Sequence, residues 1–192
     1  MLVAASVMPV LAQTTIDTRT GPVNTNWESG WTVVGQIFTA PTDNFMQTAS
    51  LWFGSNSSAA FTGVLQEWAP SGLVGPRLYE SALQTVTGVG PTRYDFNLGG
   101  VGLAPGTTYA FFADAPADQV LGYNTSNSDS YGGGNAMFGD LTTQYEWVYD
   151  QSFVGTFTGE VTAAPEPASL TLLATGLVGI LGVARRRRSR HQ

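Results

Sequence analysis

The sequence predicts an all-β fold, an antiparallel β-sandwich of the jelly-roll type, for the central part of the chain. Between residues 31 and 161, apolar and polar side chains alternate with a period of two, as in strands that bury one face. Turns rich in Gly, Pro and Asn interrupt this alternation at regular intervals. No stretch of useful length has the apolar spacing of a helix. The chain of 192 residues therefore has room for one medium-sized domain.

Eight strands are expected in order along this central part. The clearest is TRYDFNL (92–98), because its apolar residues occupy alternate positions and its polar residues lie between them. In the segment 103–114, Pro105 and Gly106 form a turn that begins the strand carrying Tyr109 and Phe111. The eight expected strands are 31–40, 47–54, 61–68, 76–83, 92–98, 103–114, 145–150 and 152–162.

The central part of the chain is acidic, whereas its C-terminus is basic. The chain has no lysine, and five of its eight arginines lie in the last eight residues. Between residues 13 and 163, three arginines oppose thirteen acidic residues, which leaves a formal charge of −10. A body this acidic repels phosphate backbones, so no nucleic-acid partner is expected. The chain has no cysteine, which excludes disulfides and thiolate sites.

The N-terminal segment has the composition of an export signal. Residues 2–11, LVAASVMPVL, form a short apolar run, and Val10 and Ala12 are small enough to precede a signal-peptidase cut. We therefore expect a signal peptide over 1–12, cleaved between Ala12 and Gln13. A buried first strand or helix is the alternative. The basic residues that normally precede the apolar run are missing, so we expect the start to be truncated, with further residues upstream.

The C-terminal segment has the order of a stop-transfer sequence. Residues 168–184 are seventeen uncharged residues, which as a helix reach about 26 Å, the lower limit for a membrane span. The arginines that follow stay cytoplasmic by the positive-inside rule, which places the body on the other side of the membrane. A buried amphipathic helix and a basic tail that binds nucleic acid are less consistent alternatives, because the run has no polar stripe and directly precedes the charges. The arginines that set this topology are Arg185, Arg186, Arg187 and Arg188.

Pro165, Glu166 and Pro167 stand directly before this apolar run, and the three parts together resemble the PEP-CTERM sorting signal of exported proteins in Gram-negative bacteria. The resemblance implies recognition and processing by an exosortase, transient residence in the inner membrane, and a mature protein of the cell surface or extracellular matrix. The expected organisation is a signal peptide (1–12), a β-sandwich (13–162) and a sorting signal (163–192) with a basic end over 185–192. The stretches 35–41 and 94–109 are also similar to the β-sandwich bodies of PEP-CTERM proteins.

Catalysis is not expected. The single histidine, His191, lies beyond the apolar run, which excludes a Ser-His nucleophile and histidine-bound zinc in the body. A carbohydrate-active enzyme that uses a pair of carboxylates remains the alternative function. Its candidates are Glu67, Glu80, Asp95 and Glu146, although no local motif links any two of them, and acids on the solvent side of strands explain them equally well.

The segment 114–140 is the longest expected irregular stretch and contains the candidate binding residues. Hard oxygen ligands there favour calcium, with Asp114, Asp118 and Asp129 as ligands; a solvated loop is the alternative, and no other cofactor is expected. The aromatic residues that could stack on sugar rings are Trp27, Trp31, Trp52, Trp68, Tyr123, Tyr131 and Trp147. Of these, Tyr123 and Tyr131 are the better candidates, whereas Trp52 and Trp68 are expected in the core. The predicted function is a non-catalytic surface protein that binds polysaccharide or a neighbouring surface protein.

Overall fold

The computed structural model of the chain describes residues 13–19, 28–55, 57–86, 91–123, 131–147 and 149–159. They belong to one compact unit, Leu11–Glu160, and contain β-strands and no helix within these ranges. The expected all-β body is therefore confirmed. The strands are β1 (Gln13–Asp17), β2 (Glu28–Trp31), β3 (Val33–Thr39), β4 (Phe45–Gly54), β5 (Ala59–Ala69), β6 (Gly72–Glu80), β7 (Gln84–Val86), β8 (Thr92–Gly102), β9 (Thr108–Asp114), β10 (Leu121–Tyr123), β11 (Ala136–Gly139), β12 (Gln144–Trp147) and β13 (Phe153–Thr158).

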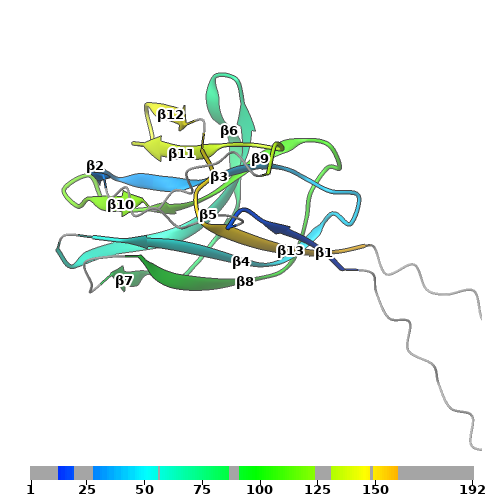
Figure 1. The fold of residues 1–192 in the computed structure, drawn as a ribbon, viewed down its shortest axis with the longest axis horizontal. Helices are drawn as coiled ribbons and strands as arrows, with labels where there is room; N and C mark the ends of the chain where they lie inside the picture. Colours follow the sequence, from blue (N-terminus) through cyan, green and yellow to red (C-terminus); the bar gives the residue numbers. More distant parts are fainter. Residues whose placement is uncertain are drawn as a thin grey trace, which may run out of the picture. The chain divides into compact units, whose positions relative to one another are not determined.

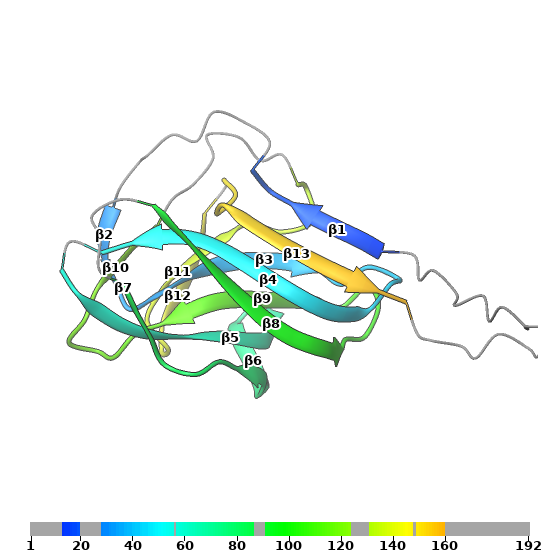
Figure 2. The same cartoon turned by 90° about the horizontal axis from the view of Figure 1, so that it is seen from below.

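Two antiparallel sheets make up this body (Figures 1 and 2). In the first sheet, β1, β13, β4 and β8 lie side by side. Beyond the N-terminal start of β13, β10 pairs with the last residues of β4, and β2 pairs with β10. In the second sheet the order is β12-β11-β3-β9-β5-β6, and β7 pairs with the start of β5. All neighbouring strands are antiparallel, as expected for strands joined by short turns.

The order of the strands agrees with the expected jelly roll. If β1, β3, β4, β5, β6, β8, β9 and β13 are numbered one to eight along the chain, the first sheet reads 1-8-3-6 and the second 2-7-4-5. The chain passes between the sheets at most of its connections, as in a double Greek key. The short strands β2, β7 and β10 and the β11–β12 hairpin are additions to this scheme.

Phenylalanines from both sheets form the main core between the sheets. Phe38 of β3 stacks on Phe153 of β13 with ring centroids 5.7 Å apart, and Phe53 of β4 meets the edge of Phe61 of β5 at 4.8 Å. These four side chains are fully buried. Each contributes about 1.5–3 kcal/mol to folding by leaving water, so packing between the sheets is a main source of stability.

A second apolar cluster covers the opposite face of the second sheet. It contains residues such as Ile37, Phe112 and Met137, which alternate along their strands with residues of the main core. The strands β3 and β9 are therefore buried on both faces. The alternation in the sequence indicated strands that bury one face and expose the other to solvent, so it did not predict this burial. The two edge strands of this sheet, β6 and β12, are also in contact with each other. The backbone N–H of Leu73 in β6 donates a hydrogen bond to Gln144 Oε1 in β12 at 3.4 Å.

The sequence suggested that the segment 114–140 is one irregular stretch, but the structure shows two strands in it. It contains β10, which pairs with β2 and β4, and β11, which pairs with β3 and β12. Strands of three or four residues rich in glycine carry too short an alternation to be recognised before their partners are known.

Candidate functional site

The edge strand β12 presents two different surfaces, because successive side chains of a strand point to opposite faces. Tyr145 and Trp147 lie on the face that continues the main core, opposite Phe138 and Ala136 of β11. Glu146 lies between them in sequence and points to the other face, toward Trp68 of β5. The two aromatic side chains form an exposed pair, and Glu146 lines a pocket.

The exposed pair consists of Tyr145 and Trp147, which are 49% and 39% exposed as whole residues. Tyr145 stacks on Phe138 with centroids 5.8 Å apart and 25° between the ring planes. Trp31 lies 5.9 Å from Tyr145, and Trp147 lies 5.9 Å from Phe138. Because the buried ring of Phe138 supports both, the pair is held in place while a large part of each ring stays in water.

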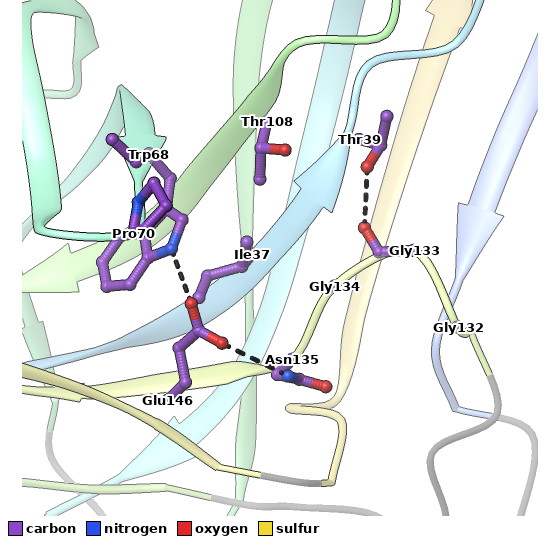
Figure 3. A pocket seen from close by; sticks show the side chains of 11 residues that line it. Ile37, Thr39, Trp68, Pro70, Thr108, Gly132, Gly133, Gly134, Asn135 and Glu146 are labelled. Carbon is purple, nitrogen blue, oxygen red and sulfur yellow. Dashed lines mark hydrogen bonds between the residues drawn. The ribbon is translucent and has the colours of Figure 1, made fainter.

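The pocket on the other face of β12 has a volume of about 370 Å³ (Figure 3). The indole Nε1 of Trp68 donates to Glu146 Oε1 at 2.8 Å, and the amide of Asn135 lies 3.4 Å from Glu146 Oε2. Trp68 is 8% exposed, so its N–H requires an acceptor, and Glu146 supplies one. The remaining lining residues are Ile37, Thr39, Ala69, Pro70, Thr108 and Gly132 to Gly134.

The loop before β11 forms one wall of this pocket and follows β3 closely. A Cβ added at Gly134 would lie 2.2 Å from the carbonyl oxygen of Ile37, at a φ of +156°. Thr39 donates its hydroxyl to the carbonyl of Gly133 at 3.0 Å. Only glycine permits this close approach of two backbones, so Gly134 fixes the shape of the wall.

The outer face of the first sheet carries a different arrangement around Trp52. The guanidinium carbons of Arg19 and Arg93 lie 4.8 and 5.2 Å from the centroid of its ring. Asp17 pairs with Arg19 at 2.6 Å, and Asp95 pairs with Arg93 at 2.7 Å. Trp52 is partly exposed here, so its expected place in the core was wrong, whereas Trp68 is buried as expected.

The three candidate calcium ligands have different surroundings. Asp114 forms an ion pair with Arg77 at 2.5 Å, and burial raises the pKa of Asp114 although this arginine lowers it. Asp118 is exposed in the turn after β9, and Asp129 lies outside the described residues. Among the described residues, no group of three His, Cys, Asp or Glu side chains is arranged to hold a metal ion. A calcium ion at Asp114 would compete with this ion pair for the carboxylate.

The two candidate tyrosines also differ from an exposed stacking pair. Tyr131 is half-buried against the main core, and its hydroxyl donates to the carbonyl of Thr39 at 3.3 Å. Burial raises the pKa of Tyr131. Tyr123 ends β10, and its side chain is outside what the structure describes. The most exposed aromatic rings among the described side chains are instead Tyr145 and Trp147.

The four candidate catalytic acids lie on different strands or strand ends. Glu80 pairs with Arg77 at 3.0 Å, Asp95 pairs with Arg93, and Glu67 is exposed on β5. The Trp68–Glu146 pocket has Glu146 as its one carboxylate among the described lining residues. A second cavity lies on the outer face of β4 and β8, and among its described lining residues Asp95 is the one carboxylate.

All residues of the predicted signal peptide (1–12) and of the sorting signal (163–192) lie outside the described residues. These include Ala12, Pro165, Glu166, Pro167, the expected span 168–184 and Arg185 to Arg188, whereas Gln13 begins β1. No helix within the described residues is long and apolar enough to cross a membrane.

The body defined by this fold is a two-sheet β-sandwich with an exposed aromatic pair at one edge. Residues 163–188 match the model of the PEP-CTERM protein-sorting motif. The chain therefore carries the sorting signal that its Pro-Glu-Pro, apolar run and arginines indicated, and this signal supports export and sorting by an exosortase. No curated protein and no solved structure matches the chain significantly.

Proposed function

We propose that this chain is an exosortase-sorted protein of the cell surface or extracellular matrix whose β-sandwich binds polysaccharide without chemistry of its own. The PEP-CTERM motif at 163–188 supports export and surface sorting. The observation that carries the binding function is the exposed pair of Tyr145 and Trp147 on one face of β12.

The aromatic pair suits the rings of a sugar chain. One face of a pyranose ring carries mainly C–H groups, which pack against the face of an aromatic ring while the hydroxyls stay in water. Two residues apart on a strand, Tyr145 and Trp147 are separated by about 7 Å along the chain direction, a spacing suited to neighbouring parts of one oligosaccharide. The support from Phe138 and Trp31 lowers the cost of ordering these rings on binding.

The charge of the body limits the kind of polysaccharide. With a formal charge of −10 between residues 13 and 163, the body repels polymers that carry many carboxylates or sulfates. Neutral or amino-bearing polysaccharides are therefore the favoured ligands.

Binding is proposed in preference to cleavage because glycoside hydrolysis ordinarily needs two carboxylates on either side of the scissile bond. Each of the two described cavities offers one among its described lining residues. Incubation with the bound polysaccharide should release no new reducing ends. Release that is lost in two of the four single variants Glu67→Gln, Glu80→Gln, Asp95→Asn and Glu146→Gln would replace binding by catalysis as the function.

Retention of the exported protein on a panel of immobilised polysaccharides tests the binding function. The wild type should be retained by at least one neutral polysaccharide, and the double variant Tyr145→Ala/Trp147→Ala should lose at least about tenfold in affinity. The control is Leu83→Ala, which removes a large apolar side chain far in sequence from Tyr145 and Trp147. Leu83 is 68% exposed. Equal binding by the wild type and the double variant would refute the assignment of this site.

A further inference from the structure

We propose that the pocket formed by Trp68 and Glu146 is a second binding site, which takes the primary ammonium group of an amino sugar. The pocket lies on the face of β12 opposite Tyr145 and Trp147, so a ligand can occupy it independently of the aromatic pair. The inference extends the proposed polysaccharide function to a second surface and to a particular charge of the sugar.

The charge of Glu146 lacks a cationic partner among the described residues. Both of its hydrogen-bond donors, the indole of Trp68 and the amide of Asn135, are neutral. Each described arginine is instead paired with other acids: Arg19 with Asp17, Arg77 with Asp114 and Glu80, and Arg93 with Asp95. The pocket therefore has a net negative charge held in a fixed position, which favours a cationic ligand.

The rest of the lining suits a sugar that carries this cation (Figure 3). Trp68, Pro70 and Ile37 supply apolar surface for the C–H groups of a ring. The hydroxyl of Thr108 and the amide of Asn135 can exchange hydrogen bonds with sugar hydroxyls. The volume of about 370 Å³ is within the range of small-molecule sites.

The structural role of Glu146 does not require its charge. An amide oxygen accepts a hydrogen bond from the Trp68 indole as a carboxylate oxygen does. Glu146→Gln should therefore keep the fold and the Trp68 contact while removing the attraction for an ammonium group. This variant separates support of Trp68 from ligand binding.

The test compares two oligosaccharides that differ in charge, the β-1,4-linked tetramers of glucosamine and of N-acetylglucosamine, at mildly acidic pH. The exported wild-type protein should bind the glucosamine tetramer at least about tenfold more tightly, and this preference should shrink at about 0.5 M salt. The indole N–H resonance of Trp68 should shift during the titration. The preference for the glucosamine tetramer and the shift of the Trp68 resonance should be lost in Glu146→Gln. Both should be kept in Glu67→Gln, which changes an exposed glutamate on β5 outside the pocket.

The outcomes separate this inference from the polysaccharide function. Equal affinity for the two tetramers, or a preference that persists in folded Glu146→Gln, would overturn the amino-sugar site. If Glu146→Gln melts much lower than the wild type, the salt dependence replaces it as the test, and a wild-type preference that is unchanged at about 0.5 M salt would also overturn the proposal. Polysaccharide binding that depends on Tyr145 and Trp147 would stand in each of these cases.

Discussion

Gln13 of β1 stands opposite Thr158 of β13 in the register of the first sheet. The first and last described strands are therefore neighbours, and the chain enters and leaves the sandwich at the same edge (Figure 2). The expected signal cleavage after Ala12 and the sorting motif at 163–188 both fall outside these paired strands. Processing at both ends would consequently leave the sandwich complete.

Strand β1 should contribute measurably to stability although it lies at an edge. Ile16 is buried in the main core, so Ile16→Ala should lower the free energy of unfolding by about 2–4 kcal/mol in urea denaturation. Thr15→Ala, an exposed position on the opposite face of the same strand, should change it by less than about 0.5 kcal/mol. A cost below about 1 kcal/mol for Ile16→Ala would show that β1 is not packed as described.

Arg93 and Trp52 should be energetically coupled on the outer face of the first sheet. The guanidinium lies 5.2 Å from the ring centroid, a distance at which an exposed cation–π pair contributes about 0.5–1 kcal/mol. A double-mutant cycle with Arg93→Gln and Trp52→Leu measures this coupling by urea denaturation. The same cycle with Arg77→Gln, which removes an arginine paired with Asp114 and Glu80, should give additive effects. If the effects in the Arg93–Trp52 cycle are also additive, Arg93 and Trp52 do not interact, which would contradict the cation–π contact.

Asp17 should stabilise the protein at neutral pH and cease to do so in acid. The hydrogen bond from Arg19 lowers the pKa of Asp17, so its contribution is present above the pKa of the unfolded chain and is lost as pH falls through the lowered pKa. Asp17→Asn should therefore lower the melting temperature at pH 7 by an amount equivalent to at most ~1 kcal/mol, and not at about pH 2. Arg19→Gln should show the same pH-dependent loss and, in addition, a loss at both pH values from its contact with Trp52. A destabilisation of Asp17→Asn that is independent of pH would point to packing instead of charge.

The sequence predicted the two-sheet architecture because alternation and turn residues are local properties. The segment 92–98 shows this well, since β8 buries Phe96 and Leu98 and exposes Arg93, Asp95 and Asn97. The second apolar cluster was not predictable in the same way. Ile37 and Phe38 are adjacent in sequence and buried on opposite faces of β3, which becomes clear only when both faces are known to be covered.

The candidate site was only partly accessible from the sequence. The signal for the aromatic pair was present in YEWVYD, where Tyr145 and Trp147 share one face of a strand and Glu146 takes the other. The ion pair of Asp114 with Arg77 joins residues that are 37 positions apart, so no local pattern indicated it. The sorting signal lies in one continuous stretch, and the sequence alone was sufficient to find it.

Glu166 should be required for sorting, because it stands between Pro165 and Pro167 in the sequence and prolines disfavour a helix that would hide it from a processing enzyme. Glu166→Ala should leave unprocessed protein in the inner membrane, as followed by fractionation and immunoblotting. Glu160→Ala, which changes an acid just outside the matched motif, should be processed normally. Normal surface display of Glu166→Ala would exclude a role for this residue in recognition.

The intact mass of the protein recovered from the cell surface tests sorting and processing most directly. We expect the basic end to stay on the cytoplasmic side, because moving its five arginines across the bilayer is prohibitive. We expect a mature chain that ends near Pro165 to Pro167, has lost about the last 25 residues, and contains none of the arginines from Arg185 onward. Full-length protein at the surface, still ending in Gln192, would contradict this.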